Sequence, residues 1–241
     1  MLALKDVTKR FGGLLAVDAV NFSVQAGEVV GLIGANGAGK TTIFSLIAGN
    51  AHPSSGEITL DGRRIDGLRP DQISQSGIAR AFQIVRPFAG MTVLENVMVG
   101  AMFGSGRVAS RGQAESIARD ILEETGLAAR ASAMAGQLTL AGRKRLEIAR
   151  ALAAKPRLVL LDEVMAGLTP TEVDEAVTLI QRVRERHGLT LIVIEHVMRA
   201  LMRLVERVVV VHHGAKLAEG TPDQVTNDPV VIEAYLGKRR R

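Results

Sequence analysis

The sequence predicts an α/β fold in which a mostly parallel sheet is flanked by helices. Between residues 146 and 212, apolar runs of strand length alternate with helical segments, a pattern typical of a parallel sheet covered on both faces. Residues 34–41 form a glycine-rich link between an apolar run and a helical run, as phosphate-binding loops do in such folds. Residues 2–60 have mainly β character, which predicts antiparallel strands beside the main sheet.

The composition limits the class of protein. Of the 241 residues, 47% are hydrophobic and 3% are aromatic, so the core is built mainly from Ala, Val, Leu and Ile. The absence of cysteine excludes a disulfide framework, a thiol nucleophile and a cysteine-based zinc site. We expect neither a signal peptide nor a membrane-spanning helix, because Lys5 and Asp6 precede any apolar stretch and no run reaches about 18 apolar residues. The net charge of +5 suits nucleotides, nucleic acid or an anionic membrane surface.

Local patterns place the strands that precede and follow the glycine-rich link. Residues 20–24 alternate between apolar and polar side chains, and residues 57–60 lead into the turn pair Asp61-Gly62. Residues 28–33 form an apolar run of strand length, and residues 42–48 have helical character. We therefore expect a strand, a loop and a helix in direct succession.

The loop itself fits the pattern G-x-x-x-x-G-K-[ST] of a phosphate-binding loop. Glycines permit backbone angles that let successive N–H groups turn toward an anion, and the next helix directs its positive end there. The motif predicts that Lys40 reaches the β- and γ-phosphates and that the Thr41 hydroxyl joins the Mg²⁺ shell. A glycine-rich turn without a ligand is the alternative. The residues expected to bind nucleotide are Gly34, Ala35, Asn36, Gly37, Ala38, Gly39, Lys40, Thr41 and Thr42.

Residues 87–145 predict a mostly helical insertion. Ile117, Ile121 and Leu122 have helical spacing within residues 113–125, and Gly126 suits the end of that helix. Glycines predict loops at residues 104–106 and 111–112. Later elements are expected as helices over residues 146–154 and 172–186, the second with a capping box from Thr169 to Glu172 around Pro170, and as strands over residues 158–161, 190–194 and 208–212.

Polar side chains are expected where three of the apolar runs end. Asp162 and Glu163 follow one run, and in phosphate-binding-loop proteins an Asp in that place holds the Mg²⁺ shell. Glu163 would then polarise an attacking water. His196 follows the run over residues 192–194 and would hydrogen-bond near the γ-phosphate, while Gln83 would reach Mg²⁺ or the water. Each feature alone is also compatible with a strand that ends at a polar surface.

Together, these motifs and their order resemble the ATP-binding subunit of an ABC transporter. The resemblance implies a P-loop ABC ATPase core in one domain of residues 1–237, with an N-terminal antiparallel β subdomain, a helical subdomain near residues 87–145, and a basic tail at residues 238–241. It equates residues 34–41 with Walker A, residues 158–162 with Walker B and residues 166–169 with the D-loop. Its implied roles are adenine stacking for Phe11, the Q-loop for Gln83, the catalytic glutamate for Glu163 and the switch histidine for His196. A core position is the alternative for Phe11.

The chain departs from this family at the signature segment, which usually reads Leu-Ser-Gly-Gly-Gln. Here residues 138–142 read Leu-Thr-Leu-Ala-Gly, so the glutamine is replaced by Gly142. Thr139 supplies the hydroxyl, and Ala141 is small enough for close backbone approach to a phosphate at a helix N-terminus. Val164 also stands where proline is common. The resemblance implies that Thr139, Ala141 and Gly142 contact ATP that is bound by a second subunit.

Further segments are similar to the branched-chain amino acid importer branch of that family. These are residues 10–17, 91–97, 145–150 and 220–237. The resemblance implies ATP hydrolysis coupled to import of branched-chain amino acids or a related small polar solute. It also implies integral membrane permease subunits, a second ATPase subunit that is identical or similar, and indirectly a solute-binding protein. The expected location is peripheral, on the cytoplasmic face of the inner membrane, without nucleic acid as a partner.

Three other functions remain open at this level. A soluble ABC-type ATPase that acts on nucleic acid or ribosomes would usually carry a long coiled coil or two tandem cassettes, which this chain lacks. A P-loop kinase needs an acceptor pocket and a lid, and a GTPase needs guanine-reading elements. A regulatory homologue that does not hydrolyse ATP is compatible with the altered signature, although Lys40, Asp162 and Glu163 favour activity.

Overall fold

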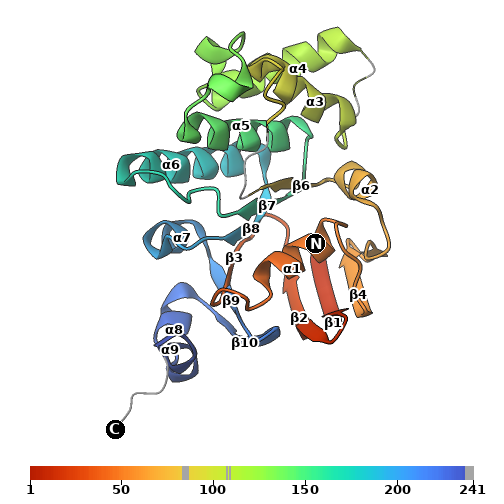
Figure 1. The fold of residues 1–241 in the computed structure, drawn as a ribbon, viewed down its shortest axis with the longest axis vertical. Coiled ribbons are helices and arrows are strands. Elements are labelled where there is room, and N and C mark those ends of the chain that lie inside the picture. The colour runs from red at the N-terminus through yellow and green to blue at the C-terminus, as the bar shows by residue number, and fades with distance from the viewer. Residues whose placement is uncertain (83–86, 107, 109, 237–241) are drawn as a thin grey trace. The chain divides into compact units, whose positions relative to one another are not determined.

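The computed structural model describes residues 1–82, 87–106, 108 and 110–236. These residues form two compact units, one made of Met1–Pro70 with the described residues from Thr190 onward, the other of Asp71–Leu189. Each unit is described by itself below, with the ribbon shown in Figure 1. The limits predicted for a helical subdomain, residues 87–145, stay a prediction.

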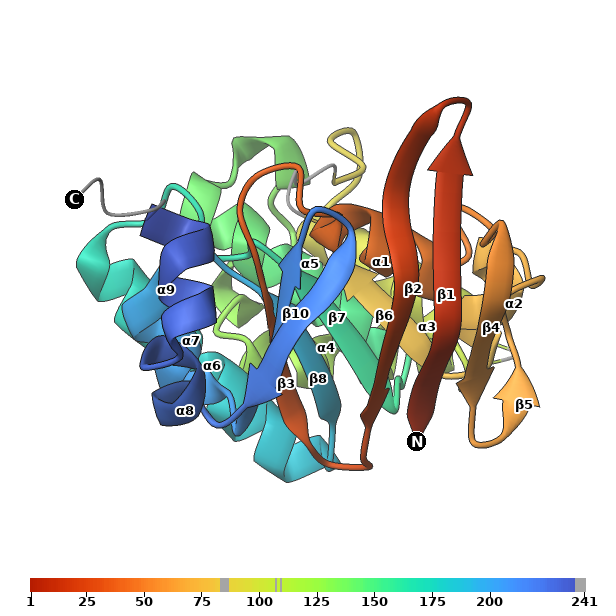
Figure 2. The same ribbon diagram turned by 90° about the horizontal axis from the view of Figure 1, so that it is seen from below.

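The first unit begins with an antiparallel sheet whose strand order is β2-β1-β4-β5. Its strands are β1 (Leu2–Phe11), β2 (Leu14–Val24), β4 (Ser55–Leu60) and β5 (Arg63–Arg64), and Figure 2 shows the first three side by side. The predicted turn pair joins β4 to β5, with Asp61 and Gly62 at φ 50° and 76°. Positive φ at both central residues is the geometry that a two-residue hairpin with right-handed strand twist needs.

The same unit contains parallel strands that lead to the predicted phosphate loop. β3 (Val29–Ile33) pairs in parallel with β8 (Thr190–Ile194) on one side and with β9 (Arg207–His212) on the other. β10 (Ala215–Gly220) then pairs antiparallel with β9. All residues of β3 and β8 are buried, as the continuous apolar runs predict.

Short helices accompany these strands: α1 (Lys40–Ile47), α7 (Met198–Leu204), α8 (Pro222–Thr226) and α9 (Pro229–Leu236). Gly31 in β3 faces the α7 segment, where a Cβ atom would lie 3.2 Å from Val205 and 3.5 Å from Leu201. The absence of a side chain at this position therefore allows the helix to pack closely against the strand.

A polar cluster around Arg207 joins the ends of several strands in this unit. Its guanidinium donates to Glu28 at 2.7 and 2.9 Å, to the Ser23 carbonyl at 2.6 Å, and to Glu219. Burial by itself raises the pKa of Glu28, but hydrogen bonds from Arg207 and the Gln25 amide, with the Arg207 charge, outweigh it. The pKa of Glu28 therefore lies below its usual value of 4.5.

The second unit pairs two parallel strands with a group of helices. β6 (Ile78–Ala81) pairs with β7 (Leu158–Asp162), and α2 (Pro70–Gln75) precedes β6. α3 (Val93–Phe103), α4 (Arg111–Glu124) and α5 (Leu140–Ala153) pack on one another, as Figure 1 shows, and α6 (Pro170–His187) follows β7. Short 3₁₀ turns at Ala128–Arg130 and Ala135–Gln137 connect α4 to α5.

Capping residues set the helix ends in this unit. The predicted capping box is confirmed at α6, where the Thr169 side chain accepts from the Glu172 amide and the Glu172 carboxylate accepts from the Thr169 amide. Gly126 follows the Thr125 cap of α4 at φ 72°. The predicted loop at residues 111–112 is wrong, because the Ser110 side chain accepts from the Gln113 amide and starts α4 at Arg111.

Among the helices described, none combines the length and the apolar character that crossing a membrane requires.

We expect Arg207→Gln to lower the free energy of unfolding by about 1–2 kcal/mol at pH 7, since it removes partly exposed, charge-assisted hydrogen bonds. The folded pKa of Glu28 is depressed, so this stabilisation is complete above pH 4.5 and is lost as the pH falls through the folded pKa. Urea unfolding at pH 7, 5 and about 3 would measure the difference. Lys5→Gln, which removes a pair with Glu57 whose two side chains are 67% and 34% exposed, is the control and should change little. If Arg207→Gln lowered the free energy of unfolding equally at all three pH values, the role given to Glu28 would be contradicted.

Candidate functional site

The predicted phosphate loop joins β3 to α1 in the first unit. Gly37 and Gly39 have φ angles of 79° and 107°, in a region that side chains disfavour. Between them, the Ala38 amide donates to the Ala35 carbonyl at 3.1 Å. Ala35, Asn36 and Gly37 are exposed, so the loop has the backbone geometry and the access that an anion needs.

Neighbouring backbone holds this loop tightly at both ends. A Cβ atom at Gly34 would overlap the Val211 carbonyl oxygen, and a Cβ at Gly39 would lie 2.6 Å from the Ala16 carbonyl oxygen. The Gly214 amide also donates to the Ala38 carbonyl at 2.9 Å. The two glycines are therefore required by close packing as well as by backbone angle.

Lys40 opens α1, and its side chain turns back over the loop. The residue is only 6% exposed, and its Nζ donates to the Gly34 carbonyl at 2.6 Å and to the Ala35 carbonyl at 3.0 Å. A buried ammonium needs such acceptors, because burial of an unpaired charge is costly. Thr41 is exposed and Thr42 is half-buried in the first turn of α1, where the positive end of the helix lies.

Two other predicted residues belong to this unit. His196 is exposed and follows β8, whose parallel register pairs Gly31 with Val193. Because β3 and β8 are parallel, the loop that follows β3 and the segment with His196 that follows β8 both leave the sheet at the same edge. Phe11 ends β1 with 50% of its surface exposed, and Lys9 Nζ lies 4.8 Å from its ring centroid. The core alternative for Phe11 is therefore wrong, and its stacking on adenine stays a prediction.

The predicted acidic pair lies at the end of β7 in the second unit. Asp162 is 1% exposed, and its Oδ2 accepts a hydrogen bond of 2.5 Å from Arg80 on β6. Its Oδ1 is buried and has no hydrogen-bond partner among the described residues. An oxygen atom in that state fits a ligand of Mg²⁺, which prefers carboxylate and other hard oxygen donors.

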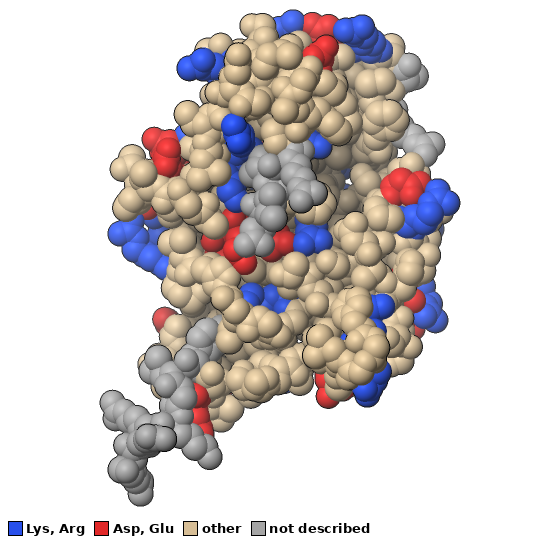
Figure 3. All heavy atoms as spheres, in the orientation of Figure 1, with Lys and Arg blue, Asp and Glu red and all other residues tan. Residues whose placement is uncertain are grey.

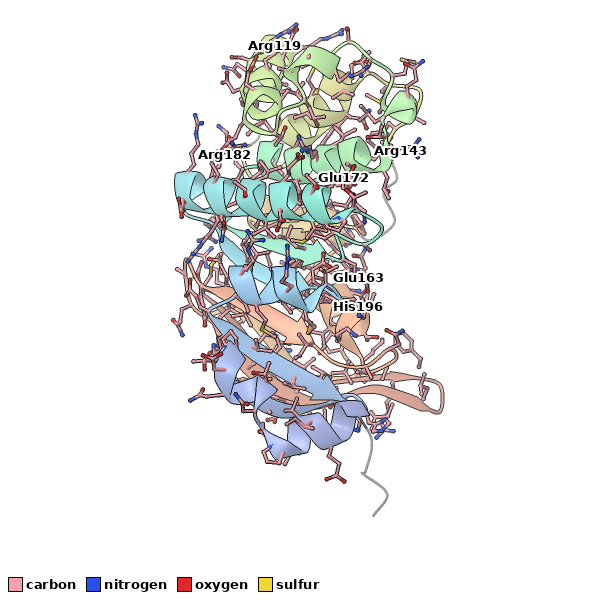
Figure 4. All side chains as sticks on the ribbon, turned by 90° about the vertical axis from the view of Figure 1, so that its left-hand side faces the viewer. Arg119, Arg143, Glu163, Glu172, Arg182 and His196 are labelled. Carbon is pink, nitrogen blue, oxygen red and sulfur yellow. The ribbon has the colours of Figure 1, made fainter. Side chains whose placement is uncertain are left out.

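Glu163 has a backbone conformation that is unusual for its residue type. Its φ is 50°, in the left-handed region, which costs a non-glycine residue on the order of 1 kcal/mol. Lys144, which is 4% exposed on α5, donates from Nζ to the Glu163 carbonyl at 3.0 Å. The backbone conformation thus determines the direction in which the half-buried Glu163 side chain leaves the chain. Figure 4 labels Glu163, which directly follows β7.

The signature-like segment forms the start of α5. Thr139 is its exposed N-cap, and its hydroxyl accepts from the Gly142 amide at 3.2 Å. Ala141 and Gly142 are half-buried in the first turn, and Arg143, labelled in Figure 4, donates to the carbonyls of Leu138 and Gly136. This helix start has the small residues and the positive dipole end that suit a phosphate.

One buried acid on the same helix does not belong to the predicted set. Burial raises the pKa of Glu147 above its usual value, although Arg150 donates to it at 2.7 Å and lowers the pKa in part. Arg150 also lies over the ring of Phe88, 5.0 Å from its centroid. The contact between Arg150 and Phe88 connects α5 to the segment before α3.

The predicted residues divide between the two units. The loop residues, Phe11 and His196 share the first unit, and Asp162, Glu163 and the signature-like segment share the second. Gln83 lies outside the described residues. Arg80 and Lys144 are not among the predicted site residues, because no motif or spacing indicates which side chain of another element reaches a strand end.

Two models of known protein families match the chain. The family model "ABC transporter" matches residues 17–166, and the model "Branched-chain amino acid ATP-binding cassette transporter" matches residues 215–240.

Relatives and solved structures align over nearly the whole chain. It is 42% identical to the high-affinity branched-chain amino acid transport ATP-binding protein BraF of Pseudomonas aeruginosa and to LivG of Escherichia coli, over 99% of this chain and 98% of each relative. It is 34% identical to the lipopolysaccharide export system ATP-binding protein LptB of Escherichia coli, over 98% and 97%. The ADP conformation of MJ1267, an ATP-binding cassette of an ABC transporter, has a TM-score of 0.88 at 29% identity and 99% coverage of both chains.

We expect Gly34→Ala to weaken ATP binding at least about tenfold, because the added methyl group can be accommodated only by a backbone shift in the loop. Titration with a fluorescent ATP analogue in the absence of Mg²⁺ would measure the loss. Gly67→Ala is the matched control, since a Cβ there meets nothing within 4 Å and its φ lies outside the positive range that side chains disfavour. Equal affinities for the two variants would contradict the close packing of the loop.

Proposed function

Because the chain belongs to the ABC transporter family of ATP-binding cassettes, we propose that it is the ATP-hydrolysing subunit of an importer for branched-chain amino acids or a related small polar solute. The family hydrolyses ATP to power transport. The observation that carries the cargo class is the match of residues 215–240 to the branched-chain cassette model, together with 42% identity to BraF and LivG.

The loop of the first unit would bind the triphosphate. Its exposed amides and the N-terminus of α1 supply donors, and Lys40 would exchange the carbonyls of Gly34 and Ala35 for phosphate oxygens. Phe11, exposed at the end of β1, would stack on the adenine. When bound, Mg²⁺ would neutralise phosphate charge, held by Thr41, Gln83 and Asp162.

Hydrolysis would then depend on a positioned water. Glu163 would accept a proton from it, and the left-handed backbone fixed by Lys144 supports a constrained carboxylate at this position. Gln83 and His196 would orient the water and the γ-phosphate. Phosphoryl transfer needs positioning and charge neutralisation more than covalent chemistry, which fits this set of residues.

A second ATPase subunit would complete each site. The helix start at Thr139, Ala141 and Gly142 would contact ATP held by the loop of that partner, which is identical or similar to this chain. The dimeric structure of MJ0796, a bacterial ABC transporter cassette, supports the proposal, with a TM-score of 0.83 at 28% identity. Replacement of the signature glutamine by Gly142 would leave the contact to backbone amides and the Thr139 hydroxyl.

The membrane permease would bind the second unit. Exposed apolar side chains support a protein contact there: Phe88 is 45% exposed, and Met102 and Phe103 at the end of α3 are 39% and 67% exposed. Attachment to permease subunits would place the chain on the cytoplasmic face of the inner membrane, with a solute-binding protein acting through the permease.

The alternative of an ATPase that acts on nucleic acid or ribosomes is not favoured. The most similar relatives reported above are transport proteins. On the described atoms of the face in Figure 3, basic and acidic side chains occur in small mixed groups rather than as a broad basic field.

We expect Glu163→Gln to retain ATP binding but to hydrolyse ATP at least tens of times more slowly, the low end of the loss of a catalytic base. Phosphate release and nucleotide affinity would be measured on the same preparation. Glu115→Gln is the matched control and should retain full activity, because Glu115 is a partly exposed residue of α4 that pairs with Arg119. A wild-type rate in the Glu163 variant would refute the assignment.

We also expect the tagged protein, when it is purified from membranes of its native host, to copurify with integral membrane subunits and with a second ATPase subunit. Vesicles that contain this complex should take up radiolabelled leucine or valine in an ATP-dependent manner. Copurification with nucleic acid or ribosomes instead of membrane proteins would overturn the proposal.

A further inference from the structure

Arg80 makes a buried ion pair with the carboxylate that is proposed to serve Mg²⁺. The side chains of Arg80 and Asp162 are 9% and 2% exposed, and Nη2 lies 2.5 Å from Oδ2. The parallel register sets Arg80 opposite Leu160, two residues before Asp162. Since residues i and i+2 of a strand share a face, the arginine side chain runs along β7 toward the carboxylate.

The pair leaves the two carboxylate oxygens in different states. Oδ2 is engaged by Arg80, whereas Oδ1 is buried without a hydrogen-bond partner among the described residues. Most buried polar atoms in native proteins have a hydrogen-bond partner, so this oxygen atom is available to a ligand. The arginine therefore fixes the rotation of the carboxylate and determines which oxygen atom remains for a metal ion.

Phe82 in turn restrains the guanidinium. The Arg80 Cζ atom lies 4.9 Å from the centroid of the Phe82 ring, within the range of a cation–π contact. Phe82 is 44% exposed and directly precedes the segment that contains Gln83. The guanidinium is thus held between an aromatic face and a carboxylate, which limits its movement.

We propose that Arg80 is a positioning residue that orients Asp162 so that Oδ1 is presented to Mg²⁺. The inference rests on the proposed function, which makes Asp162 part of the Mg²⁺ site. Arg80 also brings a positive charge near the metal, which opposes Mg²⁺ binding. Orientation outweighs this repulsion, because a neutral side chain in its place would leave a buried carboxylate unpaired and free to rotate.

The test measures how Mg²⁺ strengthens ATP binding, without turnover. The full-length protein is titrated with a fluorescent ATP analogue in EDTA and at increasing MgCl₂. For Arg80→Met we expect the ATP affinity in EDTA to change less than about twofold. The Mg²⁺ concentration that produces half of the gain in ATP affinity should rise at least about tenfold, as for other residues that orient metal ligands. Arg80→Lys keeps a charge but loses the planar fork, so its rise should be smaller.

A double-mutant cycle separates positioning from general structure. If Arg80 acts through Asp162, adding Arg80→Met to Asp162→Asn should change the Mg²⁺ dependence no further. Arg182→Met is the matched control: Arg182, labelled in Figure 4, donates to the Glu124 carbonyl on the same unit, away from the acidic pair. Thermal unfolding confirms folding of each variant, and Arg80→Lys carries the comparison if Arg80→Met does not fold.

The outcomes are distinct. An unchanged Mg²⁺ dependence in Asp162→Asn would refute the proposed metal role of Asp162 itself. Loss of that dependence in Asp162→Asn, with a normal or stronger Mg²⁺ response in the folded Arg80 variants, would overturn only the positioning role of Arg80.

Discussion

The buried ammonium of Lys40 is the constraint on which the first unit depends. An ammonium group at 6% exposure requires acceptors, and the carbonyls of Gly34 and Ala35 supply them at 2.6 and 3.0 Å. The same loop lies so close to the Val211 backbone that Gly34 has no room for a side chain. The Lys40 hydrogen bonds and this close backbone contact both hold the loop, which has its shape before a phosphate arrives.

In the second unit, buried cations likewise donate hydrogen bonds that hold the acidic residues in place. Arg80 engages Asp162, and Lys144 engages the Glu163 backbone. In each case a cation from another element fixes an acidic strand end whose side chain has a proposed task in catalysis. Such fixed groups need little reorganisation during reaction, which is how preorganised sites lower a barrier.

Much of this architecture was predictable, because local patterns determine it. The phosphate loop, the buried strands and the capping box at Thr169 each follow from a few adjacent residues. Two contacts were not predictable from the sequence. The contact of Arg80 with Asp162 depends on strand register, and the close approach of Gly39 to Ala16 depends on packing between distant segments. The start of α4 was missed because the glycine at residue 112 suggested a loop, whereas the Ser110 cap determined the helix.

The most direct test of the account is a crystal structure of the wild-type protein with Mg²⁺ and a non-hydrolysable ATP analogue. The account predicts that Lys40 Nζ leaves the carbonyls of Gly34 and Ala35 for the β- and γ-phosphate oxygens, with loop amides within hydrogen-bond distance of the β-phosphate. Bound nucleotide elsewhere on the chain, with Lys40 still on both carbonyls, would contradict it.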